Sequence, residues 1–368
     1  MKLNIQRETL LKPLQLVIGV VERKQTLPIL SNVLVTTKDD TLSVTGTDLE
    51  VELLGQTTLT ETTEAAQLTL PGRKLMDICK ALPEGAAIEL YKDKERITLK
   101  SGRSRFTLTT LPASDFPSVE TQKENVSFTV PQQELKYLLQ RTSFAMAQQD
   151  VRYYLNGMLF EVSQKGLRTV ATDGHRLALN TIDISLPENV NVQIIIPRKG
   201  ITELMRLLDD SEDNVTITIS NNHLKVICDF GTFTSKLIDG RFPDYSRVIP
   251  KGGDKVILID RDTLKSALSR TAILCNEKFR GLRFELKQNL LRILANNPEQ
   301  EAAEDELKVD YQSEDLDIGF NVNYLLDILN VLRPGLVKLT FSDSNSSMLV
   351  EEQESDGESI FVVMPMRL

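Results

Sequence analysis

The amino-acid sequence repeats itself with a period of about 125 residues, which sets the size of its folding units. Residues 5–10, 130–135 and 259–264 share one pattern, an apolar residue followed four and five positions later by Glu or Thr and then Leu. A second segment recurs at 70–82, 196–208 and 320–332, with apolar residues at helical spacing, and a third recurs at 106–111, 233–237 and 361–365. A repeat this long exceeds a solenoid unit, so each copy must bury a core of its own.

Three domains follow from this repeat, at residues 1–125, 126–253 and 254–368. Short linkers are predicted at 121–125 and 250–254, where polar residues and Gly gather. Within each copy, the two helical patterns are separated by alternating β-branched runs, as at 96–100, 215–219 and 337–341. The predicted class is therefore α+β, with three tandem homologous domains that each pack two helices on antiparallel sheet.

Composition and cysteine usage narrow the class of protein further. The 368 residues are 26% charged and 41% hydrophobic, which is typical of globular proteins. The sequence has no apolar run long enough to span a membrane, and its charged first residues are unlike a signal peptide. Three widely spaced cysteines, Cys79, Cys228 and Cys275, suit neither a disulfide framework nor a paired-cysteine metal site, and we expect buried thiols. A cytoplasmic location is expected.

The charge of the chain is divided between its predicted elements. The net charge is −9, yet the six helical patterns together carry ten more basic than acidic residues. If the helices share one face, that face attracts phosphate while the remainder repels it. The alternative is that surface helices favour Lys and Arg in general.

Enzyme signatures are weak in this sequence. His175 and His223 are its only histidines, and neither has a Cys or His at metal-ligand spacing. The sequence lacks phosphate-loop, nucleophile-elbow and dinucleotide-binding patterns. Asp173 precedes His175, but the first repeat has Asp48 at the equivalent place, which favours a structural turn over acid-base chemistry. We therefore expect a protein without catalytic residues, metal or cofactor.

Several strings in the sequence resemble those of a known family. They are Leu27-Pro-Ile-Leu, Thr45-Gly-Thr-Asp-Leu-Glu50, Asp150-Val-Arg-Tyr-Tyr-Leu-Asn-Gly-Met158, Ala171-Thr-Asp-Gly-His-Arg-Leu177, Gly240-Arg-Phe-Pro-Asp-Tyr245 and Val363-Met-Pro-Met-Arg-Leu368. Together with the three tandem domains, they closely resemble the bacterial sliding clamps, the beta subunits of DNA polymerase III. The similarity runs over essentially the full chain.

This resemblance implies a head-to-tail homodimer whose six domains close into a ring around duplex DNA, without sequence specificity. A ring that tethers a polymerase raises its effective concentration at the primer end and so confers processivity. The implied partners are the DNA polymerase III core, the clamp loader, and other DNA polymerases and repair proteins that bind through short linear peptides. No membrane partner is implied.

The resemblance also implies three groups of site residues. DNA contact falls on Lys24, Arg73, Lys80, Gln149, Arg152, Tyr153, Tyr154, Arg198, Lys199 and Arg206. A peptide pocket falls on Leu155, Thr172, Gly174, His175, Arg176, Leu177, Pro243, Arg247, Val248, Asn321, Tyr324, Val362, Val363, Met364, Pro365, Met366 and Arg367. The dimer contact falls on Lys74, Arg103, Arg105, Phe106 and Leu108 of one copy, and on Ile273, Leu274, Glu301, Glu304 and Asp305 of the other.

Two further classes of function remain open at this point. A metal-dependent DNA-processing enzyme could use paired carboxylates, which leave little trace in a sequence. A protein-only scaffold could use the peptide pocket without binding DNA. Charge changes at Arg198, Lys199 and Arg206 separate the scaffold from the clamp, since a scaffold is indifferent to them.

Overall fold

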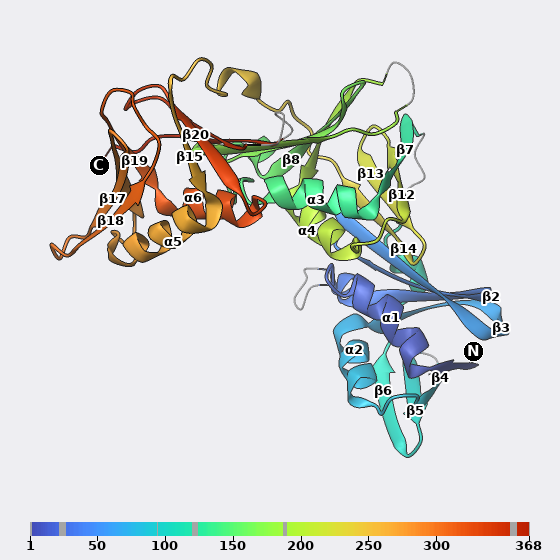
Figure 1. Ribbon diagram of the computed structural model, residues 1–368. Coiled ribbons are helices and arrows are strands. Elements are labelled where there is room, and N and C mark those ends of the chain that lie inside the picture. Colours follow the sequence, from blue (N-terminus) through green and yellow to red (C-terminus); the bar gives the residue numbers. More distant parts are fainter. Residues whose placement is uncertain are drawn as a thin grey trace. The chain divides into compact units, whose positions relative to one another are not determined.

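The computed structural model describes residues 2–21, 27–93, 95–119, 124–186, 190–353 and 359–367. The chain forms two compact units (Figure 1). One contains Met1–Gln133 with Lys199–Leu237, and the other contains Glu134–Arg198 with Ile238–Leu368. Every strand pairing is antiparallel in the part of the chain that is described. This confirms the predicted α+β class.

The unit that contains the N-terminus has two sheets, of order β1-β4-β5-β6 and β2-β3-β14-β13-β12-β7. Its helices α1 and α2 lie side by side against β2 and β3 (Figure 1). The elements are β1 (Lys2–Gln6), α1 (Arg7–Val17), η1 (Pro28–Ser31), β2 (Asn32–Thr47), β3 (Val51–Pro71), α2 (Gly72–Ala81), β4 (Ala87–Asp93), β5 (Arg96–Ser101), β6 (Ser104–Thr109), η2 (Ala113–Asp115), β7 (Val126–Pro131), α4 (Arg198–Leu207), β12 (Asn214–Ile219), β13 (His223–Cys228) and β14 (Gly231–Lys236).

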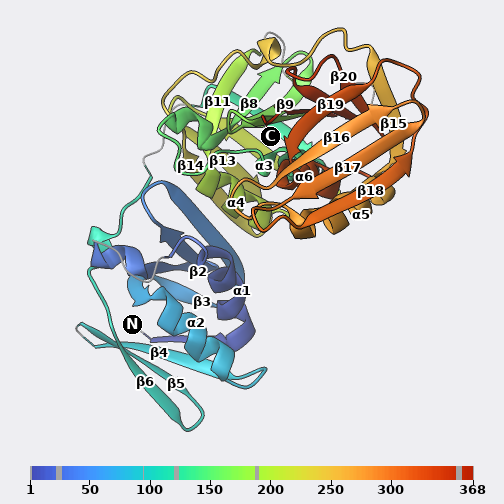
Figure 2. The same cartoon turned by 90° about the vertical axis from the view of Figure 1, so that its left-hand side faces the viewer.

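The second unit has sheets of order β11-β8-β9-β10-β22-β21-β20-β15 and β18-β17-β16-β19. Helix α5 lies beside α6 and against β17 and β18 (Figure 2). The elements are α3 (Gln132–Ser143), η3 (Tyr153–Leu155), β8 (Gly157–Ser163), β9 (Gly166–Thr172), β10 (Arg176–Ile182), β11 (Val192–Pro197), η4 (Tyr245–Arg247), β15 (Lys255–Asp260), α5 (Arg261–Thr271), η5 (Ala272–Leu274), β16 (Gly281–Lys287), β17 (Leu290–Asn296), β18 (Ala302–Lys308), β19 (Leu316–Asn321), α6 (Val322–Val331), β20 (Leu336–Phe341), β21 (Met348–Glu352) and β22 (Ser359–Val363).

The repeated segments of the sequence become strand-to-helix transitions. β1 ends at Gln6 where α1 begins, and β15 ends at Asp260 where α5 begins. The Asp260 carboxylate accepts a hydrogen bond from the backbone N–H of Thr263 at 2.8 Å, which satisfies an otherwise unpaired helix donor. All six helices predicted from the repeat are present, at α1 to α6.

Each of the two long sheets continues from one sequence repeat into the next. In the first unit, β3 pairs with β14, with Leu54 opposite Thr232. In the second unit, β10 pairs with β22, with Leu177 opposite Val362. Because sheet hydrogen bonding crosses the repeat boundaries, contacts divide the chain differently from the repeat. The domain boundaries at 125/126 and 253/254 remain a prediction.

The Asp173 turn is structural, as its counterpart in the first repeat predicts. The Asp173 carboxylate accepts hydrogen bonds from the N–H groups of His175 and Arg176, at 2.9 and 3.0 Å. The Asp48 carboxylate makes the same pair of bonds two and three residues ahead, at 2.9 and 2.7 Å. Asp173 is therefore an acceptor that closes a turn between two strands.

All three thiols are buried, as expected for structural cysteines. Burial raises the pKa of the Cys79 thiol to about 11, so this group is a poor nucleophile at neutral pH. Among the helices of the described ranges, none is long and apolar enough to cross a membrane.

Glu203 on α4 is the most buried acidic side chain of the helices that carry predicted DNA contacts, with 7% of its side chain exposed. Its carboxylate lies 3.2 Å from the Arg206 guanidinium. Burial raises the pKa of Glu203, although Arg206 and Lys199 oppose the shift. The folded protein thus binds a proton at Glu203 more tightly than the unfolded chain does, and the resulting stability is lost as pH rises through the folded pKa.

We therefore expect Glu203→Gln, which mimics the protonated acid, to raise the unfolding temperature relative to the unchanged protein at pH 8. This advantage should shrink toward pH 4, where Glu203 itself is protonated. Thermal unfolding across this pH range measures the difference, with the exposed Glu212→Gln as the matched control. A difference that is constant with pH would show that Glu203 carries no linked proton.

Candidate functional site

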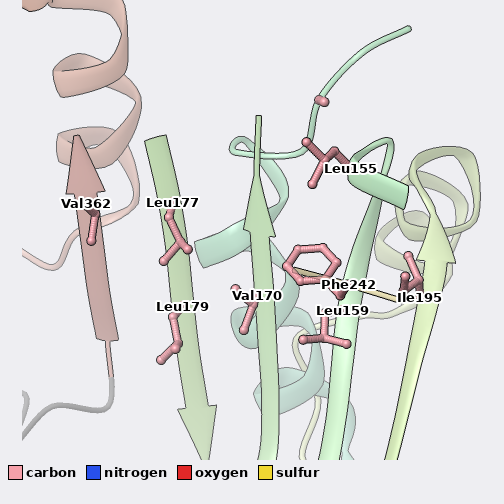
Figure 3. Close-up of a cluster of buried hydrophobic side chains, with 9 residues drawn as sticks. Leu155, Leu159, Val170, Leu177, Leu179, Ile195, Phe242 and Val362 are labelled. Carbon is pink, nitrogen blue, oxygen red and sulfur yellow. The ribbon is translucent and has the colours of Figure 1, made fainter. Parts of the chain in front are cut away.

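The predicted pocket residues Leu155, Leu177 and Val362 belong to one buried apolar cluster of the second unit. Figure 3 shows them with Leu159, Val170, Ile195 and Phe242, which point toward one another from adjacent strands of the eight-stranded sheet and from the loop that carries Phe242. Tyr154 packs against this cluster from its edge. The cluster is therefore part of the hydrophobic core of this unit, and its members are covered by other side chains.

Strand pairing brings the C-terminal segment beside the 172–177 turn. Arg176 lies opposite Val363 in the sheet, and the Met364 N–H donates to the His175 carbonyl at 2.9 Å. The Met366 N–H donates to the Gly319 carbonyl at 2.8 Å, which ties the same segment to β19. The structure thus gathers predicted pocket residues that are almost 190 positions apart in the sequence.

Arg176 is held by contacts on every side. Its guanidinium bonds the Asp173 carboxylate at 3.1 Å and the Phe144 carbonyl at 2.8 Å, and it forms a 2.5 Å ion pair with Asp327. It also stacks between the rings of Phe144 and Tyr324, at 5.2 and 4.5 Å. Arg176 therefore joins the turn after β9 to helix α6 and fixes the position of Tyr324.

Other residues of the predicted peptide pocket form the accessible surface around Arg176 and Tyr324. The His175 ring stacks on Tyr324 with centroids 6.4 Å apart, and His175, Pro243, Val248, Met364 and Arg367 are exposed. Thr172, Gly174, Pro365 and Met366 are half-buried, and Asn321 caps α6 by accepting from the Asn323 N–H.

A depression of about 610 Å³ lies beside these residues. Arg247 and Val248 form one wall, and the segment that contains Asn345 forms the other. Arg247 is paired with Asp244 at 2.8 Å but its side chain is largely exposed. The first wall is both cationic and apolar, and the second carries the hydroxyls of Ser342, Ser346 and Ser347. Such a surface suits an extended peptide.

The loop 149–154 places several predicted DNA contacts together. Arg152 binds Asp150 through two bonds, at 3.0 and 2.8 Å, and these hydrogen bonds lower the pKa of Asp150 to about 2. The Arg152 guanidinium also donates to the Asp173 carbonyl at 3.2 Å. Tyr153 is exposed and packs edge-on against Tyr154, while Gln149 is exposed with φ of +55°.

The remaining predicted DNA contacts lie on helices. Arg73 and Lys80 are on α2, where Arg73 donates to the Val21 carbonyl and Lys80 is exposed. On α4, Lys199 pairs with Asp48 at 2.5 Å and Arg206 pairs with Glu203. Arg198 donates to the Met146 carbonyl at 3.0 Å. Lys24 lies outside the described residues.

The predicted dimer residues lie along two sheet edges and one helix end. Arg105, Phe106 and Leu108 are on β6, the last strand of its sheet, and Arg103 precedes it. Glu304 and Asp305 are on β18, the last strand of another sheet, and Glu301 precedes it. Lys74 on α2 is exposed, as is Ile273 on η5, where 76% of the residue is accessible; Leu274 is half-buried.

Sequence reasoning missed Asp327 and Phe144, which hold Arg176. No local pattern singles out these two residues, because their contacts join segments far apart in the chain. Asp150 belongs to the segment 150–158 that carries the family resemblance, but the sequence does not predict its bond to Arg152. In the described ranges, no group of three or more His, Cys, Asp or Glu side chains could hold a metal ion.

Comparisons with known proteins cover the whole chain. Three family models match it: the DNA polymerase III beta subunit N-terminal domain over residues 1–120, the central domain over 129–244 and the C-terminal domain over 246–367. The beta sliding clamps of Pseudomonas aeruginosa and Escherichia coli are 56% and 50% identical to the chain, over 368 and 370 residues, and cover 100% of each sequence.

Solved structures agree with this comparison. The crystal structure of the DNA polymerase III subunit beta from Pseudomonas aeruginosa superposes with a TM-score of 0.97 at 56% identity, covering 100% of both chains. Caulobacter crescentus pol III beta superposes with a TM-score of 0.93 at 37% identity, again over 100% of both chains.

Gly174 provides a test of the Arg152 arrangement. Its φ is +88°, and an added Cβ would lie 2.9 Å from the Arg152 guanidinium. We expect Gly174→Ala to cost about 1 kcal/mol in backbone strain and to push Arg152 away from Asp150. The Asp150 pKa, followed by NMR titration, should then rise from about 2 toward its ordinary value.

Gly252→Ala is the matched control, since Gly252 has φ of +79° with no atom within 4 Å of the added Cβ. It should show similar strain and leave the pKa of Asp150 unchanged. An Asp150 pKa that does not move in Gly174→Ala would contradict the described contact.

Proposed function

The chain belongs to the family of bacterial beta sliding clamps, the processivity subunits of DNA polymerase III, and from this premise we propose how its surfaces serve that role. The observation that carries the proposal is the match of all three domain models in their order along the chain. Members of this family are not enzymes, so the alternative of a metal-dependent DNA-processing enzyme is set aside.

We propose that two copies associate head to tail through their open sheet edges. β6 carries Arg105 and is preceded by Arg103, whereas β18 carries Glu304 and Asp305. Edge strands present unpaired backbone groups, and a second copy with the opposite charge covers them. An interface of unlike surfaces forms a closed ring when the rotation between copies closes. The exposed Ile273 supports an apolar centre for this contact.

We propose that DNA is held chiefly by enclosure. Of the proposed DNA contacts, Arg152, Lys199 and Arg206 already pair with Asp150, Asp48 and Glu203. Such pairs reduce the attraction for phosphate, because a cation that binds DNA must first leave its carboxylate. Lys80 of one unit, and Gln149 and Tyr153 of the other, are exposed and can touch backbone and sugar without reading bases. Weak, sequence-independent contacts permit sliding.

We propose that the surface around His175, Val248 and Met364 is a pocket for short linear peptides. An apolar floor, exposed methionine and a few polar anchors let several different segments compete for one site. The proposed partners are the DNA polymerase III core, the clamp loader, and other DNA polymerases and repair proteins. The cell compartment of such a replication protein is the cytoplasm.

Primer extension on a long single-stranded circle, with the polymerase, clamp loader and ATP, tests this function. The unchanged protein should lengthen the products of a single binding event many-fold. The triple variant Arg198→Gln, Lys199→Gln, Arg206→Gln should shorten them. In direct DNA binding, its slope of log Kobs against log salt should be shallower by about 2 to 3, because up to three phosphate contacts are lost.

The matched control is Lys165→Gln, Lys225→Gln, Lys287→Gln, which removes the same charge from exposed positions on strands and a turn. If both triple variants leave the product lengths and the salt slopes unchanged, the result favours the protein-only scaffold over a clamp that touches DNA.

A further inference from the structure

Helices at equivalent places in the repeat can be compared position by position. α1, α3 and α5 are related by offsets of 125 and 129 residues, so Leu16, Arg141 and Arg270 are equivalent. α2, α4 and α6 are related by offsets of 126 and 124, so Ala81, Leu207 and Val331 are equivalent. In the part of the chain that the structure describes, α1 pairs with α4 and α3 pairs with α6, which leaves α5 and α2 without the corresponding pairing.

In the unit that contains the N-terminus, the end of α1 meets α4. Leu16 shares a cavity of about 290 Å³ with Glu203, Arg206 and Leu207. Gly19 lies so close to the Glu203 carboxylate that an added Cβ would clash with it. The Glu203 carboxylate on α4 therefore lies against the end of α1.

In the second unit, α3 meets α6 in the same way. Arg141 has 1% of its side chain exposed and donates to the carbonyl of Val331, the last residue of α6, at 2.8 Å. Its charge is also paired with Glu352 at 2.9 Å. Phe144, the equivalent of Gly19, contacts Arg176, which in turn binds Asp327, the equivalent of Glu203.

The equivalent faces of α2 and of the end of α5 are more exposed than those of the paired helices. On α2, Lys74, Asp77 and Ala81 are exposed and Ile78 is half-buried. Their equivalents on α4 (Gly200, Glu203, Leu204 and Leu207) are all buried, and the equivalents on α6 are buried or half-buried. These positions have the spacing i, i+3, i+4 and i+7 of a single helix face.

The other unpartnered face lies at the end of α5. Arg270 has 60% of its side chain exposed, where Arg141 is buried, and Ile273 is exposed where Phe144 and Gly19 are half-buried. Arg270 is paired with Asp305 at 2.6 Å, although most of its side chain remains exposed. Arg270 on one face and Asp77 on the other are opposite charges that can pair.

We infer that Arg270 of one protomer lies at the C-terminal end of α2 of a second protomer, as Arg141 lies at the end of α6. There it donates to the carbonyl of the partner's Ala81 and faces the partner's Asp77. This inference rests on the head-to-tail dimer of the proposed function and adds two charged residues to that interface. A guanidinium is favoured at this place because a helix C-terminus is electrically negative.

The surrounding charges set how strong the contact is. On α2, Lys74 and Lys80 flank Asp77 and oppose Arg270, while Asp305 beside Arg270 offsets them. Arg270 thus sits between two carboxylates, one from each protomer. This arrangement fixes the register of the two helices because a shift by one turn would bring Arg270 toward Lys74 or Lys80.

A charge-swap cycle tests this contact in the full-length protein. Asp77→Arg and Arg270→Asp should each raise the dissociation constant of the dimer by about tenfold or more, because each places like charges across the interface. The double variant should recover a large part of that loss. Sedimentation equilibrium measures the dissociation constant of each variant, and circular dichroism verifies folding.

Asp262→Lys, on the first turn of the same helix α5, is the matched control and should leave the dissociation constant unchanged. Ile273→Asp should produce monomers, which tests the dimer itself. If the unchanged protein is a monomer at micromolar concentration, the proposed ring fails. If the dimer forms and Ile273→Asp breaks it, but the double swap gains nothing over the single variants, the Arg270 contact is refuted.

Discussion

Backbone hydrogen bonding that runs from one repeat into the next is the constraint on which this structure depends. β3 pairs with β14, and β10 pairs with β22, so two of the repeat boundaries are crossed by a sheet. Among the edge strands that remain are β6 in the first repeat and β18 in the third. Open edges bind further strands unless they are covered. In the proposed head-to-tail dimer, β6 of each copy is covered by β18 of the other, which closes the ring.

The electrostatic arrangement agrees with a ring that retains DNA by enclosing it. If the basic side chains of this chain were all unpaired, they would bind phosphate more strongly and slow its movement along DNA. Here Arg152, Lys199 and Arg206 are each paired with a carboxylate of the same chain. Their attraction for phosphate is moderated by these pairs, and mobility along DNA is compatible with the net charge of −9. Other basic side chains stabilise the fold instead: Arg176 and Arg141 of the second repeat bind helix α6 of the third.

Much of this fold can be predicted from the sequence because the same pattern of residues occurs three times. The strand-to-helix transitions and the Asp48 and Asp173 turns follow from short patterns of neighbouring residues. The contacts of Arg176 with Phe144 and Asp327, and the burial of Arg141 against Glu352, do not follow from them. These pairs lie 32 to 211 residues apart, and their charges resemble surface residues until the tertiary fold surrounds them. The peptide-pocket residues were implied by resemblance, and of these Leu155, Leu177 and Val362 are buried in the core of the second unit.

A ring closed around DNA is topologically linked to it, and retention on circular DNA measures this linkage. The protein is placed on a nicked circular plasmid by its clamp loader with ATP, separated from free protein, and followed after a restriction enzyme linearises the DNA. We expect stable retention on the circle and rapid loss from the linear form, because a ring slides off a free end. Equal release from circle and linear DNA would contradict it, since binding would then depend on surface contact alone.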